Sequence, residues 1–181
     1  LILAAIHRRL SWTLLKDAME GTMRMTAMVV FILIGSRVFS LVFQGVDGAV
    51  WIEHMLTGLP GGQIGFLIAV NVFVFFLAFF LDFFEIAFII IPLLAPVAAK
   101  LGIDLVWFGV VMTITMEMGL IHPPVGLNIF VIKNIAPDIP LKDIIWGTLP
   151  FVILMGVAIV LLCLVPGIAL WLPNLLLPST R

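Results

Sequence analysis

An apolar run of 22 residues at positions 23–44, MRMTAMVVFILIGSRVFSLVFQ, determines the solvent in which this chain folds. A helix needs about 20 such residues to cross a hydrocarbon core that is about 30 Å thick. Apolar sequence continues beyond this run, because 64% of the chain is hydrophobic, 10% is charged and the mean hydropathy is +1.32. Ordinary globular domains are about 45–50% apolar and about 25% charged. The sequence therefore predicts an all-α membrane protein embedded in a lipid bilayer.

Five hydrophobic units follow one another along the chain. The run 23–44 is the first, and the runs 62–81 and 83–99 are joined so closely that they form a helical hairpin. The fourth unit, 104–133, is interrupted by GLIHPPVG, and the last unit is 148–172. Two other segments mix charged and apolar residues at helical spacing, which is typical of helices lying in the membrane interface: 11–22 and 140–147.

These units divide the chain into five predicted segments. The first residues, LILAAIHRR, resemble the tail of a spanning helix followed by a basic anchor, so we expect the chain to be the C-terminal part of a larger membrane protein. The segments are the end of a preceding helix with an interfacial helix (1–22), a transmembrane helix with a periplasmic connection (23–61), the helical hairpin (62–100), a broken transmembrane helix (101–135), and an interfacial helix with the last transmembrane helix (136–181).

Basic and aromatic residues predict the orientation of the chain. Cytoplasmic loops carry an excess of Lys and Arg, and Trp prefers both interfaces. If the N-terminal segment is cytoplasmic, six basic residues lie inside: Arg8, Arg9, Lys16, Arg24, Lys133 and Lys142. Lys100, Arg181, Trp51, Trp107 and Trp171 then lie on the outer side, and Trp12 and Trp146 on the inner side. Both full crossing and dipping in from outside fit the hairpin, and the absence of Lys or Arg beside its apex favours dipping in.

The stretch MEMGLIHPPVGLN at 116–128 should break a membrane helix. Proline inside a helix removes a backbone hydrogen bond and clashes with the preceding turn, at about 3 kcal/mol or more. A lone proline would indicate a packed kink, but Pro123 and Pro124 lie between Gly119 and Gly126, with Asn128 beyond them. Such a break leaves carbonyls that suit a cation on one side and N–H groups that suit an anion on the other. This arrangement is typical of a transport site.

Charged side chains at membrane depth point to the same two places. Each costs about 2.5–3.5 kcal/mol at a helix centre, so it usually faces a cavity or a partner. Asp82 and Glu85, at the hairpin apex, either form a solvated surface pair or face a cavity. Glu117 suits a capping or network role. Arg37 either holds a solute carboxylate or extends its guanidinium to the interface, and His122 either acts as a ligand or braces the open backbone.

Two long stretches resemble a known family. FFLAFFLDFFEIAFIIIPLLAPVAAKLGID and MEMGLIHPPVGLNIFVIKNIAPDIPLKDIIWGTLPF are similar to the C-terminal half of the large membrane subunit of TRAP transporters, the DctM-like permeases, and so are GSRVFSLVFQGVDG and HMLTGLPGG. The common family form has Thr at the position of His122 and a G-M-F-L-D-P-type apex in place of AFFLDFFEIA. These departures resemble a subgroup linked to mannitol, chloroaromatic or oxo-acid uptake.

The resemblance implies half of an inverted-repeat elevator transporter that is coupled to sodium. A periplasmic solute-binding protein would deliver a small carboxylate solute, and a small membrane subunit would complete the complex in the bacterial inner membrane. No cofactor besides the coupling ion Na⁺ is expected. The alternative is a secondary transporter of the same superfamily that acts without a binding protein. The predicted solute-binding residues are Asp82, Phe83, Gly126, Asn128 and Arg37, and the predicted sodium-binding residues are Asp82, Gly119, His122, Pro123 and Val125.

Other functional classes lack support in the sequence. It contains no H-E-x-x-H and no G-x-S-x-G, so we do not expect an enzyme. The net charge of −1 gives no basic surface for nucleic acid. Cys163 is the single cysteine and lies in an apolar run, where a small core residue is its expected role.

Overall fold

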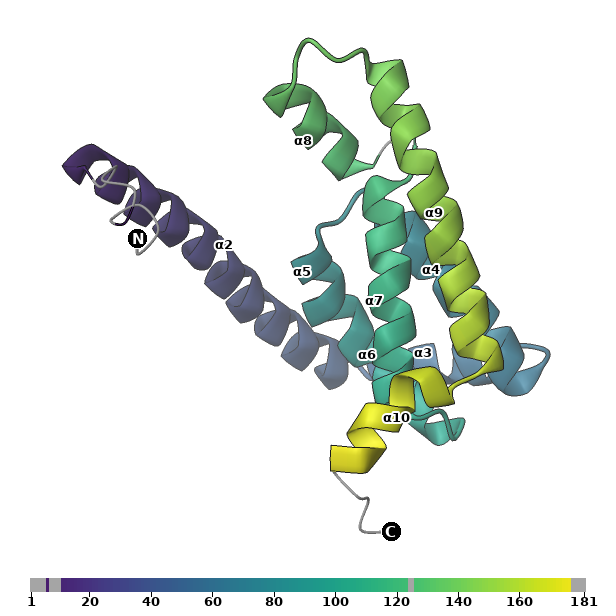
Figure 1. Ribbon diagram of the computed structural model, residues 1–181. Coiled ribbons are helices and arrows are strands. Elements are labelled where there is room, and N and C mark those ends of the chain that lie inside the picture. The colour runs from purple at the N-terminus through teal and green to yellow at the C-terminus, as the bar shows by residue number, and fades with distance from the viewer. Residues whose placement is uncertain (1–5, 7–10, 124–125, 177–181) are drawn as a thin grey trace.

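The computed structural model describes residue 6 and residues 11–123 and 126–176, of which Leu127 is described by its backbone alone. The described residues form helices and contain no strand, and three helices are long and apolar enough to cross a membrane: Trp12–Gly45, Phe83–Lys100 and Leu141–Leu164. A fourth span results if Gly48–Thr57 and Gly62–Leu77, which meet at 117°, are counted together. The prediction of an all-α membrane protein is confirmed (Figure 1).

Helix α2 (Trp12–Gly45) is continuous over 34 residues, so the predicted end of an interfacial helix at residue 22 is wrong. Ser11 caps the helix by accepting a hydrogen bond from the backbone N–H of Leu14 at 3.2 Å. Gly21 is the only helix-weakening residue near the expected boundary, and one glycine costs only about 1 kcal/mol. At 1.5 Å per residue the helix is about 51 Å long. Its N-terminal half extends away from the other helices (Figure 1).

The predicted hairpin consists of α4 (Gly62–Leu77), a turn, and a second arm that runs from Phe83 to Lys100. Its base is closed by a hydrogen bond from the Gln63 side chain to the carbonyl of Leu101. An ion pair joins Lys100 to Glu53 on α3 (Gly48–Thr57), a short helix within the expected periplasmic connection. The chain therefore leaves the hairpin beside the point where it entered.

The second arm of the hairpin is not a uniform α-helix. A short turn, α5 (Phe83–Glu85), leads into a π-helical segment, η1 (Ile86–Ile90), and then into α6 (Ile91–Lys100). Pro92 has no N–H to donate to the carbonyl four residues before it, which weakens the α-helical pattern at this position. π-Helical turns of this kind are frequent at functional sites.

The predicted broken helix consists of α7 (Leu105–Ile121) and α8 (Leu127–Ile135). Asp104 caps α7 by accepting hydrogen bonds from the N–H groups of Val106 at 2.8 Å and Trp107 at 3.0 Å. The helix ends at His122, whose ψ of 127° is extended. A proline disfavours helical geometry in the residue before it, so Pro123 accounts for this ending.

The C-terminal part contains α9 (Leu141–Leu164) and α10 (Gly167–Leu176). The expected interfacial helix 140–147 is the start of α9, so the predicted boundary at residue 147 is wrong. The last hydrophobic unit is instead divided at residues 165–166, where Pro166 ends the ladder of backbone hydrogen bonds. Trp107, expected at the interface, is 7% exposed and belongs to the core.

Candidate functional site at the hairpin apex and the helix break

Helices α4 and α7 lie side by side and run in the same direction. Four contacts follow one another along both helices, and we call this row the α4–α7 seam. It consists of Phe66 with Phe108, Asn71 with Thr115, Ala78 with Gly119, and Phe79 with His122. The seam brings the end of the first hairpin arm to the level at which α7 breaks.

Gly119 makes the closest approach in the seam. A Cβ atom at this position would overlap the Cβ of Ala78 and would lie 3.0 Å from the carbonyl oxygen of Phe75. Gly126, on the other side of the break, is equally confined, because its Cβ would lie 2.7 Å from the carbonyl oxygen of Leu120 and 2.9 Å from the backbone N and O of His122. Neither position therefore has room for a side chain.

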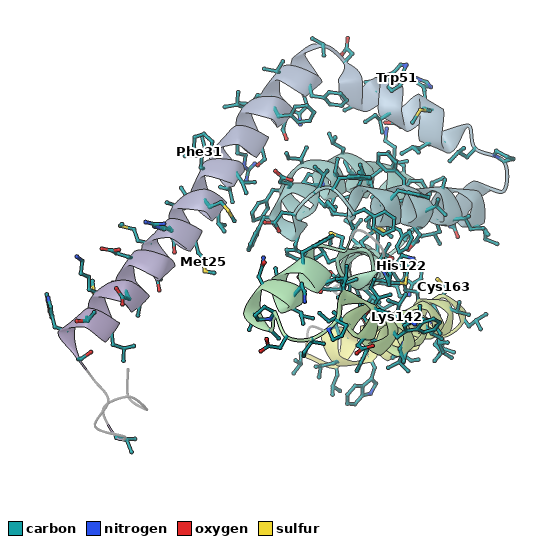
Figure 2. All side chains as sticks on the ribbon, turned by 90° about the horizontal axis from the view of Figure 1, so that it is seen from above. Met25, Phe31, Trp51, His122, Lys142 and Cys163 are labelled. Atoms are coloured by element: carbon teal, nitrogen blue, oxygen red, sulfur yellow. The ribbon has the colours of Figure 1, made fainter. Side chains whose placement is uncertain are left out.

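His122 lies between the two halves of the broken helix. Its N–H donates to the carbonyl of Gly119 at 3.2 Å, and its own carbonyl accepts from the N–H of Gly126 at 2.9 Å. The imidazole stacks on Phe79 with a centroid distance of 5.6 Å and meets Phe75 edge-on at 5.1 Å. Figure 2 shows His122 inside the bundle, whereas Met25 and Phe31 project from the part of α2 that leaves it.

The imidazole also carries an unused polar atom. Among the described side chains, Nδ1 of His122 is the buried nitrogen or oxygen that has no hydrogen-bond partner. Such an atom costs free energy until it gains a partner. The site therefore retains one hydrogen-bonding position directly beside the open backbone.

Asp82 and Glu85 form a capping box at the start of the second hairpin arm. The N–H of Phe84 donates to Oδ1 of Asp82 at 3.4 Å, and the N–H of Asp82 donates to Oε2 of Glu85 at 3.1 Å. Asp82 is therefore the N-cap of this arm, a role that the sequence analysis above did not assign to it. Asp82, Glu85 and Phe83 are each half-buried, so the carboxylate of Asp82 retains free acceptor positions.

The other predicted site residues are placed less closely together. Asn128 lies half-buried in the first turn of α8, and no hydrogen bond joins it to Asp82 within the described chain. Arg37 is exposed on α2 and has no ion-pair partner among the described residues. Pro123 is half-buried. Pro124, Val125, Arg8, Arg9 and Arg181 lie outside the described residues. Their predicted roles in binding, and those of the residues above, stay predictions.

The sequence analysis missed two polar residues in the seam. Thr115 donates its hydroxyl hydrogen to Oδ1 of Asn71 at 2.6 Å, and Nδ2 of Asn71 donates to the carbonyl of Leu67 at 2.8 Å. Asn71 is the single polar residue in the apolar run 64–81, and a lone amide in such a run often bonds to another helix. That isolation was the available signal.

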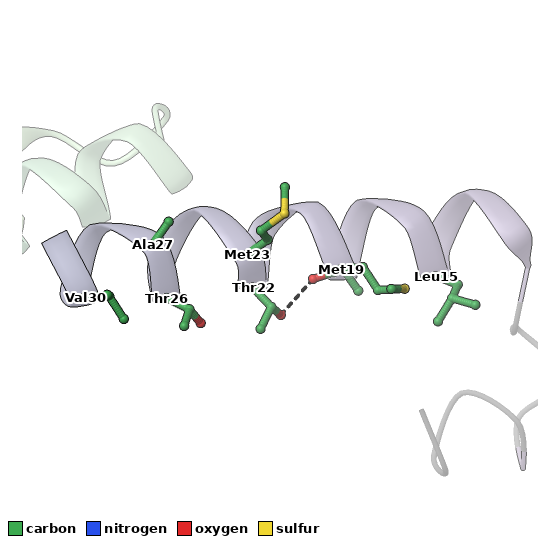
Figure 3. Close-up of a pocket in the computed structure, with 8 residues that line it drawn as sticks. Leu15, Met19, Thr22, Met23, Thr26, Ala27 and Val30 are labelled. Atoms are coloured by element: carbon green, nitrogen blue, oxygen red, sulfur yellow. Dashed lines mark hydrogen bonds between the residues drawn. The ribbon is translucent and has the colours of Figure 1, made fainter.

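A large surface hollow lies away from this site. It has a volume of about 640 Å³, and all its lining residues belong to α2 (Figure 3): Leu15, Ala18, Met19, Thr22, Met23, Thr26, Ala27 and Val30. Thr22 donates to the carbonyl of Ala18 at 2.8 Å, so its hydroxyl is satisfied within the helix. A hollow lined by one apolar helix face lacks the converging polar groups of a solute site.

The family model of the tripartite ATP-independent periplasmic transporter, DctM component, matches residues 1–168. The chain belongs to this family. The resemblance of the hairpin and of the double-proline segment to DctM-like permeases is thereby confirmed.

Curated relatives carry the same family name. The C4-dicarboxylate TRAP transporter large permease protein DctM of Rhodobacter capsulatus is 36% identical over 154 residues, which are 84% of this chain and 34% of that protein. DctM of Vibrio cholerae is 32% identical over 154 residues, covering 85% and 34%. The sialic acid TRAP transporter permease protein SiaT of Haemophilus influenzae is 27% identical over 173 residues, covering 96% and 28%.

The DctM-family chain thus spans about a third of the length of these relatives. Their names describe transporter permeases. Family membership and the apolar helices together identify a multi-pass membrane protein.

Proposed function

We propose that this chain forms part of a sodium-coupled permease that receives small carboxylate solutes from a periplasmic binding protein. The permease would lie in the bacterial inner membrane together with a small membrane subunit. The observation that carries the proposal is the contact between Ala78, at the end of the first hairpin arm, and Gly119, just before the helix break. Two interrupted elements that meet at membrane depth are typical of secondary transporters.

The lengths of α4 and α7 support a hairpin that dips into the membrane. The 16 residues of α4 and the 17 residues of α7 give lengths of about 24 Å and about 25 Å, each shorter than a hydrocarbon core of about 30 Å. Because the two helices run in parallel and end at the same level, the hairpin apex and the break lie at one depth. The nine residues of α8 would then continue toward the opposite membrane surface.

The break offers partners for both a cation and a carboxylate. The last turn of α7 ends in carbonyls, and the negative end of a helix dipole attracts a cation such as Na⁺. The first turn of α8 offers N–H groups, which favour an anion, and Asn128 and Nδ1 of His122 add side-chain hydrogen-bonding positions. A carboxylate solute would therefore lie on the α8 side of the break and sodium on the α7 side.

The names of the relatives support carboxylates as the solute class. DctM proteins are named for C4-dicarboxylates and SiaT for sialic acid, and both kinds of compound carry carboxylate groups. Because the relatives also include an ectoine/5-hydroxyectoine permease, the class is broad.

Uptake by the assembled transporter in proteoliposomes tests the proposal. A dicarboxylate or sialic acid, the cognate binding protein and an inward sodium gradient should together give uptake above the level seen with an equal potassium gradient. Uptake that is unchanged when potassium replaces sodium would contradict the coupling. Full uptake without the binding protein would favour the alternative, a secondary transporter of the same superfamily that acts without one.

A further inference from the structure

We propose that Asn71 and Thr115 are positioning residues, which set the register of the first hairpin arm against the broken helix and thereby the affinity of the sodium site. The inference rests on the proposed function, because it assigns the two residues to the sodium-coupled reaction. Neither residue belongs to the predicted ligand set. They would act through the contact between Ala78 and Gly119.

The hydrogen bonds around Thr115 have one consistent arrangement. Its hydroxyl oxygen lies 2.6 Å from Oδ1 of Asn71 and 3.0 Å from the carbonyl oxygen of Val111, but it carries a single hydrogen. At 2.6 Å two acceptors would repel each other, so the hydrogen lies between Thr115 and Asn71. The amide Nδ2 of Asn71 then donates to the carbonyl oxygen of Leu67. A flipped amide would instead place Oδ1 against that carbonyl oxygen, so that two acceptors would face each other.

The hydrogen bond between Thr115 and Asn71 can fix the register of α4 against α7 because it is buried. Thr115 is 1% exposed, so water does not replace a lost partner there. Neighbouring seam residues are apolar, and apolar contacts tolerate small displacements that a hydrogen bond does not. A slide of one residue would move α4 by about 1.5 Å along α7, which is enough to break a bond of this length.

Asn71 and Thr115 lie about one helical turn before the close contact at the hairpin apex. Gly119 lies four residues after Thr115 on α7, and Phe75, whose carbonyl lies against Gly119, lies four residues after Asn71 on α4. Residues four apart share a helix face. The hydrogen bond and the close approach are therefore consecutive contacts of the seam, and a displacement at one is transmitted to the other.

The test measures the sodium concentration that gives half-maximal uptake by the assembled transporter. Thr115→Val replaces the hydroxyl by a methyl group of similar shape and should raise this concentration about fivefold to tenfold, as expected for the loss of one buried hydrogen bond. Thr115→Ser keeps the hydroxyl and should stay within about twofold of the wild type. Thr113→Val is the matched control, because Thr113 is exposed and bonds only within α7.

A second variant keeps the inference testable if Thr115→Val folds poorly. Asn71→Leu combined with Thr115→Val leaves no unpaired buried group, so it should be recovered in a folded form while retaining the raised sodium requirement. A wild-type sodium requirement in this double variant, or an equal rise in Thr113→Val, would overturn the inference. Wild-type uptake that is independent of sodium would instead overturn the proposed function and the inference with it.

Discussion

The indole N–H of Trp107 donates a hydrogen bond to the carbonyl oxygen of Leu162 at 2.8 Å. In a continuous helix this carbonyl would accept from residue 166, but residue 166 is proline and has no N–H. Trp107, at the start of α7, therefore satisfies a backbone group that Pro166 leaves open near the end of α9. The bond joins two helices at a point where a proline would otherwise leave a buried carbonyl unpaired.

Replacing Trp107 with Phe should lower stability while leaving the fold intact. The ring volume is partly kept, but the carbonyl of Leu162 loses its donor, and an unsatisfied buried acceptor costs about 1–3 kcal/mol. The measurement is thermal unfolding of the purified transporter in detergent. Trp51→Phe is the control, because Trp51 is 66% exposed. Equal melting temperatures for the two variants would show that the indole bond contributes nothing.

Gly119→Ala should impair transport severely. The added methyl group would overlap Ala78, and forcing the two helices apart costs about 1–3 kcal/mol in a packed interior. Gly109→Ala on the same helix is a matched control, because a Cβ atom there meets nothing within 4 Å. Uptake rates per folded transporter should fall for the first variant and stay unchanged for the second. Normal uptake by Gly119→Ala would contradict the tight contact at the apex.

Substitutions of Asp82 can separate its cap from a role for its charge. Asp82→Asn keeps a side-chain oxygen for the N–H of Phe84, whereas Asp82→Ala removes the cap at about 1 kcal/mol. If the charge also attracts sodium, Asp82→Asn should raise the sodium concentration needed for half-maximal uptake with little change in melting temperature. An unchanged sodium requirement would leave the cap as the sole role of Asp82.

Cysteine labelling can test whether the hairpin dips into the membrane. The expectation that Cys163 is a core residue is wrong, because its side chain is exposed, so it is first changed to Ser to leave the introduced cysteine as the sole thiol of the described residues. Cysteines at Phe83 or Phe84 should then resist a membrane-impermeant thiol reagent applied from the cytoplasmic side when the permease faces outward. A cysteine at Lys142, whose position was predicted to be cytoplasmic, provides the positive control. Rapid labelling of the apex from that side in every state would indicate two full spans.

Local chemistry explains which features the sequence could predict. Two prolines and the adjacent glycines locate the break between α7 and α8, because their effect depends on neighbouring residues alone. The boundaries at residues 22 and 147 were wrong because charged residues at helical spacing do not end a helix without a terminating signal. Such residues are compatible with both an interfacial helix and the extension of a spanning one.

Contacts between distant residues could not be predicted in the same way. Thr115 lies 44 residues from Asn71, and Trp107 lies 55 residues from Leu162. Each pair depends on how the helices pack, and neither residue type nor spacing indicates the partner. The proline at residue 166 does indicate an unpaired carbonyl at Leu162, but many donors could have satisfied it.

The two sides of the hairpin apex rest on different helices, and this has a mechanical consequence. The first arm, α4, packs along α7, whereas α5 and η1 at the start of the second arm contact α2, and α6 at its end contacts α3 and α7. If α7 moved relative to α2, α4 would follow α7, whereas α5 and η1 would follow α2. The strain would then collect in the short turn between residues 77 and 83, which carries Asp82 at its end. Relative motion of two distant helices would in this way be converted into a change of shape at the apex, beside the break that holds His122.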